Sequence, residues 1–133
     1  MVKMPKEVMD MFNDPEASKV LATVDADGKL NVAPKGSIIA ADEETIAFAD
    51  IFGDKTNKNL ESTKKASAVS FKMPPAGYQI KGKFEGFKKA GPLYDSFAKK
   101  VKEMLNMDIK AVGTIKVDEV YSVGPPDFGK KIA

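Results

Sequence analysis

Apolar residues recur along the chain in short runs, and polar turn residues separate these runs. Six runs alternate or stay apolar over lengths typical of β-strands: residues 19–24, 29–40, 45–49, 66–71, 78–87 and 111–123. Three further segments show helical spacing of apolar residues or begin at a helix-capping residue: 5–12, 54–62 and 91–105. The pattern therefore predicts a mainly β protein with six strands and three helices.

Short turns join the first three predicted strands. Residues 25–28, Asp-Ala-Asp-Gly, form a tight-turn sequence, and residues 42–44, Asp-Glu-Glu, form a second turn. Turns this short permit only antiparallel neighbours. We therefore expect a three-stranded meander over residues 19–49, within an antiparallel β-barrel that carries flanking helices. No repeat or long linker interrupts the chain, so we predict one domain over residues 1–133.

The composition narrows the chemistry that the side chains can perform. The 133 residues include no Cys, no His and no Trp, and all 21 basic residues are Lys. These absences exclude disulfides, thiol nucleophiles, Ser-His-Asp catalysis, zinc ligated by His or Cys, and arginine forks on phosphate. Any demanding chemistry is therefore expected to come from a bound cofactor. No acid/base pair of carboxylates stands out, and we assign no catalytic side chain.

Charge and hydropathy indicate the surroundings of the protein. The net charge of +2 is well short of that of a dedicated nucleic-acid binder. No apolar run approaches the roughly 20 residues of a membrane-spanning helix, and the N-terminus has no signal-peptide core. We therefore expect a cytoplasmic protein without a membrane span or a nucleic-acid partner.

The second predicted strand contains residues that suit a strand poorly. Pro34 cannot donate to a sheet hydrogen bond, and Gly36 weakens a strand interior. Together they predict either a bend at a corner of the barrel or a place where a ligand approaches the backbone closely.

A second conflict lies at the start of the predicted helix 54–62. Helix N-termini offer free N–H groups and favour anions, so Lys55 at the first helical position opposes the helix dipole. A phosphate held by Lys55, the Thr56 hydroxyl and the backbone amides would remove the conflict. The alternative is a solvated lysine beside an ordinary Asp54 cap, whose carboxylate would compete with a phosphate for those amides.

Four segments in this order resemble the pyridoxamine 5′-phosphate oxidase-related FMN-binding proteins: residues 31–37, 45–50, 54–60 and 82–97. The resemblance covers about residues 19–123, nearly the whole chain. It implies a six-stranded antiparallel split β-barrel that forms a homodimer, with FMN bound between the subunits. It also implies an oxidoreductase or an electron carrier that uses the bound FMN.

The resemblance also implies roles for particular residues. The cofactor-binding set would be Ala33, Pro34, Lys35 and Gly36 along the flavin, Ala49, Asp50 and Ile51 through backbone hydrogen bonds to the ring, and Lys55 and Thr56 on the phosphate. Residues of the second subunit near the prolines 125–126 would close the site. Relatives that oxidise pyridoxamine phosphate clamp phosphates with arginines and use a histidine. This chain has neither, so we do not expect that activity, nor histidine-ligated haem chemistry.

Other functions remain open on the sequence alone. Some related split barrels bind a deazaflavin in place of FMN. A small barrel that binds single-stranded nucleic acid is a second alternative, in which Tyr78, Phe84 and Phe87 would stack bases. The odd separation of Phe84 and Phe87 puts them on opposite faces of a regular strand, which disfavours this alternative. A cofactor-free dimeric binding module is a third alternative.

Overall fold

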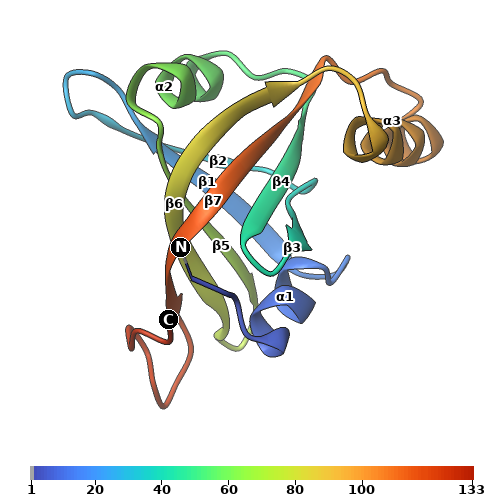
Figure 1. Ribbon diagram of the computed structural model, residues 1–133. Coiled ribbons are helices and arrows are strands. Elements are labelled where there is room, and N and C mark those ends of the chain that lie inside the picture. Colours follow the sequence, from blue (N-terminus) through green and yellow to red (C-terminus); the bar gives the residue numbers. More distant parts are fainter. Residues whose placement is uncertain (1) are drawn as a thin grey trace.

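The structure is a computed structural model that describes residues 2–133 as one curved antiparallel sheet with three helices at its margins (Figure 1). In chain order the elements are α1 (Lys6–Phe12), β1 (Ser18–Val24), β2 (Leu30–Pro34), β3 (Ile39–Asp42), β4 (Thr45–Asp50), α2 (Lys55–Thr63), β5 (Lys65–Lys72), β6 (Ala76–Lys88), α3 (Pro92–Leu105) and β7 (Ala111–Ser122). The mainly β class and the three helices are confirmed. Within residues 2–133, no helix has both the length and the apolar character needed to cross a membrane.

The sheet is a barrel that does not close. Its strand order is β2-β1-β5-β6-β7-β4-β3, and every neighbouring pair is antiparallel. No ladder joins the edge strands β2 and β3 in the part of the chain that the structure describes, so the barrel is split between them. Figure 1 shows α2 and α3 at one end of the sheet and α1 at the other.

The predicted meander of three strands is wrong, and the sheet has seven strands in place of six. The expected strand 29–40 is interrupted at residues 35–38, which form a turn between β2 and β3. β2 pairs with β1, whereas β3 pairs with β4 at the opposite edge of the sheet. β2 ends at Pro34, the Lys35 N–H makes one further hydrogen bond to the Lys19 carbonyl of β1, and the chain then crosses from one edge to the other.

The hairpin between β1 and β2 is confirmed, and its turn is held by side-chain hydrogen bonds. Asp25 Oδ1 accepts hydrogen bonds from the N–H groups of Asp27 and Lys29, both at 2.9 Å. Gly28 adopts a positive φ of 83°, which a glycine tolerates without a steric cost. The local turn chemistry therefore sets the register of Val24 opposite Leu30.

A β-bulge places Phe84 and Phe87 together, contrary to the expectation for a regular strand. The register of β6 on β7 shifts between Phe84 and Gly86, and Gly86 has a positive φ of 120°. The rings of Phe84 and Phe87 consequently meet edge to face with their centroids 4.8 Å apart. Phe84 is only 5% exposed and lies in the core, which leaves its ring unavailable for base stacking.

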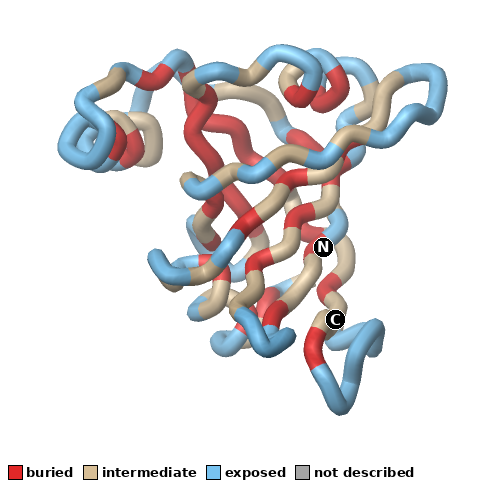
Figure 2. Tube along the Cα trace, turned by 180° about the vertical axis from the view of Figure 1, so that it is seen from behind, coloured by how far each residue is buried: buried red, intermediate tan, exposed pale blue. Residues whose placement is uncertain are grey.

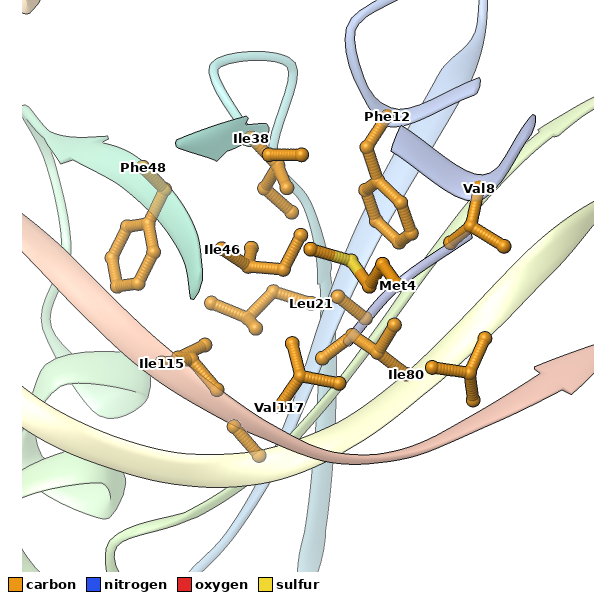
Figure 3. Packing of buried hydrophobic residues seen from close by; sticks show 14 of the residues in the cluster. Met4, Val8, Phe12, Leu21, Ile38, Ile46, Phe48, Ile80, Ile115 and Val117 are labelled. Atoms are coloured by element: carbon orange, nitrogen blue, oxygen red, sulfur yellow. The ribbon is translucent and has the colours of Figure 1, made fainter. Parts of the chain in front are cut away.

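The main core fills the interior of the curved sheet. Helix α1 contributes Val8 and Phe12, which pack with side chains from β1, β4, β6 and β7 (Figure 3). Figure 2 shows that buried positions concentrate on the strands, whereas loops and outer helix faces are exposed. A second, smaller cluster forms where Phe97 and Val101 of α3 pack with Val112 of β7. The main cluster holds α1 against the sheet, and the smaller cluster holds α3 against β7.

Candidate functional site

A cleft of about 940 Å³ lies beside β2, between the loop after β4, the start of α2 and one face of α3. Pockets for small molecules and cofactors usually measure roughly 300–1,000 Å³ and have mostly apolar walls with a few polar groups. The cleft has the same character, because apolar side chains form most of its walls and lysines, hydroxyls and amides are spaced among them.

The structure brings eight of the nine predicted cofactor-binding residues together in this cleft. They are Ala33, Pro34, Lys35, Gly36, Ala49, Ile51, Lys55 and Thr56. Asp50 does not line the cleft: its side chain is buried, and its Oδ1 accepts a hydrogen bond from the Gly53 N–H at 3.0 Å. The Asp50 carbonyl accepts from the Lys110 N–H at 2.8 Å. Asp50 therefore shapes the loop at residues 51–54 from behind the cleft wall.

One end of the cleft is formed by the N-terminus of α2. The first intrahelical hydrogen bond runs from the Lys58 N–H to the Asp54 carbonyl at 3.0 Å, so the N–H groups of residues 55–57 have no acceptor within the helix. The Asp54 carboxylate does not cap them, and it instead forms an ion pair with Lys58 Nζ at 3.3 Å. The competition for the amides that the sequence suggested is thus absent, and Lys55 remains exposed at the rim of the cleft.

Two side-chain hydrogen bonds hold α2 against the first hairpin. Asn31 Nδ2 donates to Thr56 Oγ1 at 3.2 Å, and Asn59 Nδ2 donates to Thr23 Oγ1 at 3.0 Å. Thr56 is buried, and because its oxygen accepts from Asn31, its O–H hydrogen is left to donate to another group in the cleft. Asn31 lies at an inward position on β2 and lines the cleft, although the sequence pattern did not indicate it as a site residue.

The middle of the cleft is formed by β2 and the turn that follows it. Lys35 is half-buried, and its Nζ lies 5.1 Å from the centroid of the Phe48 ring. Burial lowers the pKa of the Lys35 ammonium, and the negative charge of Asp50 opposes this effect. The Ala49 N–H, predicted to contact a flavin ring, instead donates to Ser37 Oγ at 2.9 Å.

Helix α3 supplies a wall of the cleft that the sequence analysis did not assign to the site. The periodicity correctly predicts an apolar face, but this face extends beyond the core. Phe97 and Val101 are buried, whereas Met104 is 80% exposed and Leu105 also lies open to the cleft. Helical spacing alone does not distinguish an apolar face that packs in the core from one that borders a ligand site.

The residues present fit a phosphate-bearing cofactor such as FMN. Free N–H groups, the exposed Lys55 ammonium and the Thr56 hydroxyl offer donors and positive charge at the α2 end, as a phosphate requires. The adjoining apolar walls at Ala33, Ile51 and Phe97 suit a flat aromatic ring.

Comparisons with known proteins show which family the chain belongs to. The sequence profile described as pyridoxamine 5′-phosphate oxidase matches residues 4–124. A protein of Methanocaldococcus jannaschii is 35% identical over 118 residues, which are 85% of this chain and 78% of that protein.

Two solved structures share the fold. HupZ of Group A Streptococcus superposes with a TM-score of 0.83 at 25% identity, covering 98% of this chain and 99% of that one. An FMN-binding protein from Syntrophomonas wolfei superposes with a TM-score of 0.83 at 21% identity, covering 90% of this chain and 85% of that one. The match of the profile over most of the chain shows that the protein belongs to the pyridoxamine 5′-phosphate oxidase family.

Proposed function

We propose that the protein binds FMN in the cleft beside β2 and uses it for oxidation–reduction or electron transfer. The observation that carries the proposal is the α2 N-terminus: its N–H groups are uncapped, and Lys55 and Thr56 lie beside them at one end of the cleft. The family membership supports the same assignment. The flavin, when bound, supplies the electron-accepting chemistry.

The side chains of this chain bind and orient the cofactor in the proposal, and none transfers a proton. Lys55 and the free amides of α2 neutralise the phosphate, and the Thr56 hydroxyl donates to one of its oxygens. The wall formed by β2 and the loop 51–54 excludes water from one face of the ring. Lysine binds phosphate as a point charge without the fixed fork of arginine. The lack of Arg and His speaks against oxidation of pyridoxamine phosphate as the activity.

Exposed apolar side chains around the cleft support the proposal of a homodimer. Val32 is 64% exposed, Phe52 is 75% exposed, and Met104 and Leu105 extend the patch from α3. Large apolar side chains exposed around one cleft are typical of an interface or a ligand groove. We propose that a second copy of the chain covers this patch and completes the cofactor site.

Absorbance spectroscopy of the purified protein, with and without added FMN, tests the proposal. We expect a flavin band that stays with the protein through gel filtration, and FMN as the mass of the compound released by heating. Protein that remains colourless after FMN addition would contradict the proposal. If the released compound has the mass of a deazaflavin, the cofactor of the protein is that deazaflavin and not FMN.

A substitution at the phosphate end sharpens this test. Losing a hydrogen bond to a charged group costs about 1.5–3 kcal/mol, so Lys55→Ala should raise the Kd for FMN roughly 10–100-fold. Lys58→Ala is the matched control, because Lys58 lies one turn later on α2 and pairs with Asp54. Equal FMN affinity of both variants would show that the phosphate is held elsewhere.

A further inference from the structure

Two lysines face each other across the β1–β2 ladder on the inner side of the sheet. The last register pair is Val20 with Pro34, and the Lys35 N–H donates to the Lys19 carbonyl at 3.0 Å, which makes Lys19 and Lys35 the next pair. Directly opposite residues of an antiparallel ladder project to the same face. That face is the inner one, because Leu21, two residues beyond Lys19, is fully buried in the core.

Neither lysine has a counter-charge that satisfies it. Lys19 is 7% exposed, and in residues 2–133 neither ammonium forms an ion pair or a side-chain hydrogen bond. The acidic groups that act on them are committed elsewhere: Asp14 pairs with Lys72, and Asp50 accepts from the Gly53 N–H. Burial lowers the pKa of both lysines.

The pair is an anomaly for a protein without a ligand. Like charges directly opposite each other in a sheet are destabilising, and buried charges normally have partners. Both lysines line the cleft, so a ligand that enters the cleft can reach the space between them. An oxyanion that accepted hydrogen bonds from both ammonium groups would supply the counter-charge that each of them lacks.

The pair lies away from the phosphate end of the cleft. Asn31 contacts Thr56, and Lys35 follows Asn31 by four residues of extended chain. At about 3.3 Å per residue, this spacing corresponds to roughly 13 Å along β2. An anion at the lysine pair is therefore a group separate from one that the α2 N-terminus holds.

We propose that Lys19 and Lys35 form a second anion subsite, which binds the carboxylate or phosphate group of the substrate that reacts at the proposed flavin. The assignment to a substrate rests on the proposed function, whereas anion binding by the lysine pair does not. The subsite would select acidic substrates and place their anionic group at the end of the cleft opposite Lys55.

Nuclear magnetic resonance of protein labelled at lysine 13Cε tests the subsite. Inorganic phosphate and succinate are titrated separately into FMN-loaded protein and into protein freed of FMN. We expect an anion-dependent rise in the pKa of two lysine resonances, assigned by their loss in Lys19→Met and Lys35→Met. The arm with the larger response distinguishes a phosphate from a carboxylate ligand.

The matched pair of variants is Lys19→Met and Lys29→Met, since Lys29 is exposed on the hairpin turn outside the cleft. Lys19→Met should weaken anion binding at Lys35 at least about tenfold, whereas Lys29→Met should not. Equal responses in the two variants, or no response of either wild-type resonance to either anion, would overturn the subsite.

Two further results separate the subsite from the proposed function. Loss of FMN from Lys19→Met as severe as that from Lys55→Ala would mean that the pair binds the cofactor's own phosphate, and the separate subsite would fail. An anion response in protein that never binds FMN would retain the subsite and reject the flavin.

Discussion

The interior of the barrel and the cleft beside β2 are both built mainly from apolar side chains, but these side chains are buried in the interior and several are exposed in the cleft. In the interior, Phe12, Leu21 and Phe48 are fully buried and belong to one hydrophobic cluster. In the cleft, Phe52 and Met104 are largely exposed. Burying a large apolar side chain stabilises a protein by about 1.5–3 kcal/mol, so the interior holds the fold together and the cleft wall contributes little.

Polar groups show the same contrast. Buried polar side chains beside the core are mostly paired, as in the bond from Ser70 Oγ to the Met11 carbonyl at 2.7 Å. The cleft instead contains uncapped amides and the ammonium groups of Lys19 and Lys35, which have no ion-pair partner among residues 2–133. Features that cost stability in the free protein and face one cavity are typical of binding sites.

The largest effect on stability is expected in the interior. Phe12→Ala removes a fully buried ring from the contact between α1 and the sheet. Such truncations leave a cavity and cost about 3–5 kcal/mol of unfolding free energy. Urea unfolding followed by circular dichroism measures the loss. A loss below about 1 kcal/mol would show that α1 is not an integral part of the core.

A smaller change in the unfolding free energy, this time a gain, is expected on substitution of Lys19 at the inner end of the cleft. The pKa of Lys19 is lowered below its usual 10.5, so between the two values the folded protein binds fewer protons than the unfolded chain. Charged Lys19 therefore costs stability at neutral pH, and the cost falls as the pH rises toward 10.5. Lys19→Met should stabilise the protein by about 1 kcal/mol at pH 7, with a smaller gain near pH 10.

Unfolding of both proteins in urea at the two pH values measures this difference in the absence of added oxyanions. Lys29→Met, on the exposed turn, should show no gain at either pH. If Lys19→Met destabilises the protein at pH 7, the Lys19 charge is satisfied in the folded state. Lys19 would then be paired like the polar groups of the interior.

The smallest effect on the fold is expected at the cleft wall. Met104→Gln should change the unfolding free energy of the monomer by no more than about 0.5 kcal/mol, because the side chain is exposed and both residues are good helix formers. It should weaken the proposed dimer, which sedimentation velocity measures over a range of concentrations. Glu103→Gln is the control on the same helix. Equal association of the two variants would place the interface elsewhere.

Features that depend on neighbouring residues in the chain could be predicted from the sequence. The turn at residues 25–28 follows from local hydrogen bonding, and the structure has it. The helix α2 also begins at Lys55 as predicted, although the Asp54 carboxylate that was expected to cap it pairs with Lys58 instead. The family resemblance named eight residues that the structure brings into one cleft, although they come from three separate segments. Their contacts with a cofactor remain predictions.

Features that depend on distant parts of the chain could not be predicted. The interruption at residues 35–38 was visible as Pro34 and Gly36, but only the complete sheet determines that β3 lies at the far edge. The alternation along β1 puts Lys19 on the same face as Leu21, so its inward orientation could be predicted. The alternation does not indicate which side chains or ligand would lie against Lys19. Gly86 within a strand is compatible with a bulge, but the bulge is established only by the register of β6 on β7.

The split of the barrel leaves two edges at which a foreign strand could add, and the ends of β2 and β3 limit this hazard. β2 has only five residues and ends at Pro34, which offers no N–H to an incoming chain. β3 has four residues, and its register on β4 shifts between Ala40 and Asp42. Short, interrupted edges give a poor template for intermolecular pairing. The same proline that ends one wall of the cleft thus protects the open sheet against aggregation.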